Sequence, residues 1–214
     1  MTCRRSWPQP ILRTAWTPDE PMFSTEILML LITGAVAGGI VVGVAGFGGG
    51  PVVLSVWLLF LEPTVAVPAL MLAGVLFLLP AMWPVRAGFH FNRILPFAIG
   101  AAVGLPIGTQ LLVTLTSEQM KFGIGAFLIL FAATRLVWLS RYTIPLTGFR
   151  AKLADGGLGT IGGIVCGTTA LPGPIFSMWC GMRGWSKDEQ RCVYQPLNYA
   201  VVVMSVVSLS LIHI

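Results

Sequence analysis

Two short stretches rich in glycine and proline interrupt an otherwise apolar sequence. The first is GFGGGP at residues 46–51, and the second is TTALPGP at residues 168–174. Such a break predicts that one helix ends and another begins, because proline suits the first turn of a helix, where its missing N–H is not needed. The N–H groups at a helix start have no intrahelical partner and carry the positive end of the helix dipole. Both stretches therefore predict anion binding.

The predicted site comprises residues of both breaks and includes two threonine hydroxyls of the second. These residues are Gly46, Phe47, Gly48, Gly49, Gly50, Pro51, Thr168, Thr169, Pro172, Gly173 and Pro174. The first break is not a phosphate-binding P-loop, because no Lys-Ser or Lys-Thr pair follows its glycines. The competing interpretation is that glycines simply allow helices to approach closely. We prefer that interpretation for the glycines at four-residue spacing, such as Gly100/Gly104/Gly108 and Gly159/Gly163/Gly167.

The composition indicates an integral membrane protein. Of the 214 residues, 56% are hydrophobic and only 10% are charged, whereas soluble domains carry about 25% charged residues. Several uncharged stretches of membrane-spanning length follow one another, which predicts an all-α, polytopic transmembrane bundle in contact with the lipid bilayer. The net charge of +5 is spread between these stretches. We therefore expect no nucleic-acid partner.

Catalytic and metal-binding patterns are missing from the sequence. The four cysteines, Cys3, Cys166, Cys180 and Cys192, form no Cys-x-x-Cys pair, so ordinary reduced thiols are expected. No nucleophile, acid–base pair or metal cluster is expected at membrane depth. We therefore predict a protein that is not an enzyme and has no cofactor and no metal.

Six apolar blocks cover about 27–61, 64–83, 94–115, 120–139, 153–182 and 193 to the end. The first has 35 residues, enough for a helix of about 52 Å in a hydrocarbon core of about 30 Å. We therefore expect a nearly full helix over 27–44, the glycine break, and a short helix over 51–61. The fifth block predicts the same arrangement, with helices over 153–168 and 174–182.

The two broken blocks indicate an internal duplication. GGIVVGVAGFGGGP at 38–51 and GGIVCGTTALPGP at 162–174 share Gly-Gly-Ile-Val-x-Gly and a final Gly-Pro, at an offset of about 124. This predicts an N-terminal tail (1–26), a first transmembrane repeat (27–150) and a second, truncated repeat (151–214). The repeats are expected to be inverted if the short helix reaches the far side of the membrane, and parallel if it is re-entrant.

The distribution of basic residues predicts the orientation in the membrane. The joints at 84–93, 140–152 and 183–191 carry lysines and arginines, whereas those at 62–63 and 116–119 carry none. The basic joints are expected to be cytoplasmic. Four arginines of these joints are interpreted as topology signals or as parts of a cytoplasmic funnel for an anion: Arg86, Arg93, Arg183 and Arg191. No aspartate or glutamate is expected at mid-membrane depth, so no clear proton carrier is predicted, and Glu62 beside Pro63 is the least poor candidate.

The chain resembles the sulfite exporter TauE/SafE family of membrane permeases. The resemblance rests on the glycine-rich stretch from Gly39 to Val53, its second copy from Gly159 to Pro174 and the order of helices between them. It implies transport of a small anion, such as sulfite, a sulfonate or a related organic anion, across the bacterial inner membrane. Carried over by position, the motif residues are Gly46–Pro51 and Pro172–Pro174. The second break departs from the first, so equal roles are not expected.

The sequence therefore predicts a secondary transporter that holds a small anion between two helix ends. The alternative, from another class, is a non-transporting membrane scaffold or assembly subunit, in which the loop at 183–191 would matter most. The oligomeric state, the identity of the anion, the direction of transport and the coupling ion are left open by the sequence.

Overall fold

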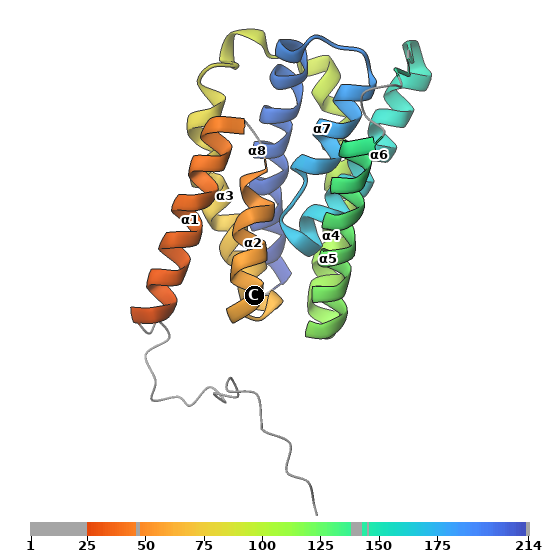
Figure 1. Ribbon diagram of the computed structural model, residues 1–214. Helices are drawn as coiled ribbons and strands as arrows, with labels where there is room; N and C mark the ends of the chain where they lie inside the picture. Colours follow the sequence, from red (N-terminus) through yellow and green to blue (C-terminus); the bar gives the residue numbers. More distant parts are fainter. Residues whose placement is uncertain (1–24, 46–47, 138–142, 145, 213–214) are drawn as a thin grey trace, which may run out of the picture.

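The computed structural model describes residues 25–45, 48–137, 143–144 and 146–212. Within these ranges the chain is helical and contains no strand (Figure 1), which confirms the all-α prediction. The helices are α1 (Thr25–Ala45), α2 (Gly49–Phe60), α3 (Pro63–Met82), η1 (Arg86–Gly88), α4 (Phe91–Thr114), α5 (Ser117–Val137), α6 (Gly148–Thr169), α7 (Gly173–Met182) and α8 (Lys187–Ile212). Most of the predicted N-terminal tail, together with Gly46 and Phe47, lies outside the described residues.

Most helix ends lie within a few residues of the predicted ones, and the largest differences are at α6 and α8. The former begins at Gly148 rather than at 153, and the latter begins at Lys187 rather than at 193. Both added turns carry charged side chains, which a search for apolar blocks leaves out. The helices therefore extend beyond their apolar segments.

Helices α1 and α2 form an antiparallel hairpin. Gly34 of α1 lies beside Trp57, whereas Gly38 lies beside Val53, so later positions in α1 face earlier positions in α2. Helices α6 and α7 form a second antiparallel hairpin, in which Gly162 lies beside Phe176. The short helix that follows each break thus runs back along the helix before it.

The two hairpins point in opposite directions (Figure 1). Helices α4 and α6 run parallel, because Gly100 lies against Gly156 and Gly108 against Ile164. Helices α2, α3 and α4 each reverse the direction of the helix before them, so α4 runs opposite to α1. Since α6 is parallel to α4, α6 also runs opposite to α1. Because α2 itself contributes one of the reversals, a short helix that turns back along α1 is compatible with opposed hairpins.

The polar joints gather at the two ends of the bundle. At one end, Arg93 Nη1 lies 3.3 Å from Glu189 Oε1, and the N–H of Ile144 donates to the carbonyl of Met182 at 2.7 Å. At the other end, Ser117 Oγ donates to Glu62 Oε2 at 3.0 Å. The described residues of the three basic joints therefore share one end, opposite the start of α1 (Figure 1).

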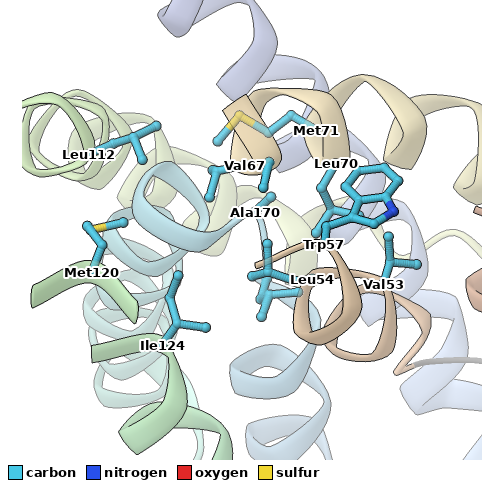
Figure 2. Close-up of a cluster of buried hydrophobic side chains, with 12 residues drawn as sticks. Val53, Leu54, Trp57, Val67, Leu70, Met71, Leu112, Met120, Ile124 and Ala170 are labelled. Atoms are coloured by element: carbon cyan, nitrogen blue, oxygen red, sulfur yellow. The ribbon is translucent and has the colours of Figure 1, made fainter. Parts of the chain in front are cut away.

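Two groups of buried apolar side chains hold the helices together. The first lies between α2, α3, α4 and α5 and also receives Ala170 from the second break (Figure 2). The second joins α4, α6, α7 and α8, with the rings of Phe97 and Phe176 edge to face at 6.1 Å. Because Ala170 belongs to the first group, the second break packs against the half of the chain that contains the first.

The outer surface of the bundle is apolar. Leu59, Leu76 and Ile129 are each more than 70% exposed, which suits contact with lipid rather than water. Among the described residues, three helices are long and apolar enough to cross a membrane: Pro63–Met82, Phe91–Thr114 and Lys187–Leu211.

Candidate functional site

The two breaks meet at a cavity of about 80 Å³. Its walls also include residues of α3 and α8. From the breaks it is lined by Gly48, Gly49, Gly50, Pro51, Ala170, Leu171, Pro172, Gly173 and Pro174. The structure thus brings together seven of the predicted site residues from stretches more than a hundred positions apart.

The glycines of the first break have distinct structural environments. Gly48, the residue before α2, has φ +89°, a left-handed conformation that L side chains rarely adopt. Gly49 packs so closely on α1 that a Cβ there would collide with the carbonyl oxygen of Gly38. A Cβ at Gly50 would lie 2.7 Å from Leu171 Cδ2. Gly50 is therefore the position at which the first break contacts the second.

The second break is built differently. Ala170 follows α6 with φ 58°, and it is the one non-glycine residue with positive φ in the described part of the chain. The Thr169 hydroxyl accepts the N–H of Leu171 at 3.3 Å and donates to the carbonyl of Val165 at 2.7 Å. The Thr168 hydroxyl donates to the carbonyl of Ile164 at 2.9 Å. Neither threonine lines the cavity. Their hydroxyls instead bond to the backbone at the end of α6 and in the second break.

The start of a helix lines the cavity on each side. Helix α2 begins at Gly49 and α7 at Gly173, each with a proline in its first turn. The first N–H groups of these helices have no partner within their own helix, and both helix dipoles add positive potential there. No acidic residue is among the described residues that line the cavity. The backbone N–H groups at the two helix starts are therefore the groups of this site that could bind an anion.

Two side-chain amides that the sequence interpretation did not select complete the cavity. Gln195 and Asn198 lie on one face of α8, line the cavity and are 7% and 6% exposed. Gln195 Oε1 and Asn198 Oδ1 are buried and have no hydrogen-bond partner. The signal that could have found them is their place in an apolar helix, because polar side chains inside a membrane are costly and mark functional sites.

A second buried polar group lies near the basic end of the bundle. Trp179 Nε1 donates to Asp155 Oδ1 at 2.7 Å, and Arg183 Nη2 lies 4.0 Å from Asp155 Oδ2. The side chains of Asp155 and Arg183 are 7% and 8% exposed. Arg183 is thus buried rather than a free loop residue, and the sequence interpretation assigned Asp155 no role.

A larger cavity of about 370 Å³ lies between α5 and the α6–α7 hairpin. Its lining is almost entirely apolar, with Thr134 as an exception. The Thr134 hydroxyl already contacts the carbonyl of Phe131 at 2.9 Å and Met178 Sδ at 3.8 Å. This cavity is larger than the one at the breaks, but its lining side chains offer an anion no free donor, since Trp179 Nε1 already donates to Asp155.

The described residues offer no group of three or more histidine, cysteine, aspartate or glutamate side chains that would hold a metal ion. Cys166 and Cys180 are buried free thiols, and Cys192 is a half-buried one. Cys3 lies outside the described residues. The polar groups available for chemistry at the breaks are thus backbone N–H groups and two amides.

The chain matches a known protein family. The sequence model of a protein family, described as sulfite exporter TauE/SafE, matches residues 30–213. This match covers both breaks and every helix that lines the cavity. No curated protein and no solved structure matches the chain.

Proposed function

The chain belongs to the sulfite exporter TauE/SafE family, and from this membership we propose that it is a secondary transporter of small anions. Sulfite, sulfonates and related organic anions are the proposed substrates, and the bacterial inner membrane is the proposed location. The observation that carries the proposal is the cavity lined by the starts of both α2 and α7. Broken helices whose N-terminal ends meet inside a membrane are a usual form of anion site in transporters.

In the proposed site, the anion binds between the first turns of α2 and α7. Gly48, Gly49 and Gly50 face it from one side, and Gly173 faces it from the other. Glycine allows the substrate to approach the backbone closely, because no Cβ covers the N–H groups. Pro51, Pro172 and Pro174 fix the starts of the two helices. Thr168 and Thr169 hold the second break without contacting the substrate.

We also propose that the chain is an inverted duplication with glycine-broken helices. The starts of α1, α2 and α3 correspond to those of α6, α7 and α8 at offsets of 123 or 124 residues. The opposite orientation of the two hairpins supports an inverted relation (Figure 1). Access would alternate when one repeat rocks against the other around the fixed site. The repeats are placed at 27–150 and 151–214.

We further propose that the chain crosses the membrane several times, with the basic end of the bundle in the cytoplasm. The described residues of the three basic joints lie at that end, which agrees with the positive-inside rule. The start of α1 would then face the periplasm.

The test is uptake of sulfite and of small sulfonates by proteoliposomes that contain the purified protein. Gly50→Leu should abolish uptake, because its side chain would fill the cavity and collide with Leu171. The matched control is Gly123→Leu, at an exposed position of α5 where an added Cβ meets nothing within 4 Å. Normal uptake by Gly50→Leu, at equal insertion, would contradict the proposed site.

A protein that inserts, folds and moves no anion in either form would instead fit the scaffold alternative. In that case, replacement of residues 183–191 should be the damaging change in cells, and the Gly50→Leu protein should behave as the parent does.

A further inference from the structure

The α1–α2 and α6–α7 hairpins are held together by contacts at corresponding positions. A Cβ at Gly38 would meet Val53 across the first hairpin, and a Cβ at Gly162 would meet Phe176 across the second. Gly162 follows Gly38 by 124 positions, and Phe176 follows Val53 by 123. These are the offsets at which the starts of the helices correspond. The proposed duplication thus describes how the helices pack as well as where they begin.

One neighbour of α6 has no counterpart beside α1. Helix α1 packs on α2 and α3, and α6 packs on their counterparts, α7 and α8. In addition, α6 packs along α4, in the most extensive contact between two described helices. No described helix packs along α1 in the corresponding way. The place beside α1 that corresponds to α4 is therefore open in the described part of the chain.

The positions of α6 that contact α4 identify the matching surface of α1. Four positions of α6 lie against the backbone of α4 along one face: Gly156, Thr160, Gly163 and Ile164. Their counterparts in α1, 124 positions earlier, are Ile32, Val36, Gly39 and Ile40. We call these four residues of α1 the open face.

The open face has the features of a helix contact but no helix against it. Ile32, Val36 and Ile40 are each more than half exposed, and a Cβ at Gly39 would meet nothing within 4 Å. Glycine inside a helix lowers its stability relative to alanine, and close packing against a second helix is the usual compensation in a membrane. Gly163 makes such a contact with Ala101, whereas its counterpart Gly39 makes none among the described residues.

We propose that the open face binds a transmembrane helix that is not among α1 to α8. Because α4 runs parallel to α6, this partner helix runs parallel to α1. It is apolar and has glycine or alanine at every fourth position of its contact face, as α4 has at Gly100, Gly104 and Gly108. The proposal rests on the proposed duplication, and it does not depend on which anion is moved or on whether one is moved.

A second copy of this chain is the less favourable occupant. The helix of the chain that fits such a face is α4, and its glycines are already packed against α6. If two copies met through α1, the exposed side chains of Ile32, Val36 and Ile40 would face the same three side chains of the other copy. Branched side chains at those positions keep two helices apart, whereas the glycines of α4 allow close approach.

The experiment measures the binding of a synthetic peptide with the sequence of α4, residues 91–114, to the full-length protein in lipid nanodiscs. The protein carries a donor dye at Glu118→Cys in a background without native cysteines, and the peptide carries an acceptor dye at one end. Glu118 lies at the end of the bundle that holds the start of α1. A peptide parallel to α1 should therefore give more energy transfer when its N-terminus is labelled than when its C-terminus is labelled.

Two variants of α1 assign the binding to the open face. Gly39→Leu should weaken binding of the peptide by about tenfold or more, because its side chain would occupy the line of closest approach. Ala37→Leu is the matched control and should bind as the parent does. Ala37 is also exposed on α1, but it lies two positions from Gly39 and so points to the opposite side of the helix.

The results separate the possible occupants of the open face. Binding that is stronger in transfer from the N-terminal label and is lost in Gly39→Leu alone supports the proposal. No binding to the parent, equal binding to Gly39→Leu, or stronger transfer from the C-terminal label would overturn it. Energy transfer between two labelled copies that Gly39→Leu abolishes would also overturn it, because the occupant would then be a second copy. Each of these outcomes leaves the uptake of anions by proteoliposomes as a separate test of the proposed function.

Discussion

Gly48, Gly49 and Gly50 are adjacent in the sequence but meet three different requirements. Gly48 has a left-handed φ of +89°, Gly49 lies against the backbone of α1, and Gly50 faces the second break. A glycine triplet is typical of a break, but the sequence does not show which glycine serves the helix contact and which faces the cavity. A substitution meant to fill the cavity should therefore be made at Gly50. A large side chain at Gly49 would instead push α1 away from α2.

At the residue scale, the buried pair Asp155 and Arg183 leads to a prediction about stability. Arg183 Nε and Nη1 are buried and have no hydrogen-bond partner, so Asp155 is the counter-charge of the guanidinium, which also lies 5.4 Å from the centre of the Trp185 ring. Asp155→Leu should lower the free energy of unfolding by about 3–5 kcal/mol, because a guanidinium cannot be neutralised and would stay buried without a counter-charge. The measurement is reversible unfolding in mixed micelles.

The double variant Asp155→Leu/Arg183→Met is the control for this pair, since it removes both charges. It should regain most of the lost stability, because replacing a whole buried pair by apolar side chains is often neutral. A double variant as unstable as Asp155→Leu would show that the pair is not the cause.

At the element scale, α4 and α6 are held together by glycines on both helices. Gly100, Gly104 and Gly108 of α4 lie against the backbone of α6, and Gly159, Gly163 and Gly167 of α6 lie against the backbone of α4. The four-residue spacing predicted close packing, and the structure confirms it. The spacing did not show that these two helices pair with each other, or that they run parallel.

This interface predicts a difference between two glycines of α6. Gly163→Leu should lower the free energy of unfolding by at least about 3 kcal/mol, because its Cβ would collide with the backbone of Ala101. Gly157→Leu, where an added Cβ meets nothing within 4 Å, should change stability by no more than about 1 kcal/mol. Thermal unfolding followed by size-exclusion chromatography would rank the two. Equal losses would contradict the described α4–α6 contact.

Much of the helix order could be predicted, because long apolar blocks and glycine–proline breaks are local signals. The sequence also identified both breaks, of which Gly48–Pro51 and Pro172–Pro174 meet at one cavity. It did not identify Gln195 and Asn198, since their importance depends on which face of α8 is turned toward the breaks. Asp155 was missed for a similar reason, because its partner Arg183 lies 28 positions away in a segment interpreted as a loop.

At the scale of the whole molecule, the orientation of the bundle can be tested by labelling. Glu118 is exposed at the end of the bundle that holds the start of α1, and Lys187 is exposed at the basic end. In a background without native cysteines, Glu118→Cys in intact cells should react with a membrane-impermeant maleimide. Lys187→Cys should react only after the cells are opened. The reverse pattern would overturn the proposed orientation and leave the fold unchanged.

The interlocked backbones of α4 and α6 also limit how the molecule can move. Helix α4 belongs to the first proposed repeat and α6 to the second. Along their contact, glycines of each helix lie directly against the backbone of the other. Translation of one repeat along the other would force carbonyl groups through the opposing backbone. If the two proposed repeats move relative to each other, rotation about this contact is therefore easier than translation along it.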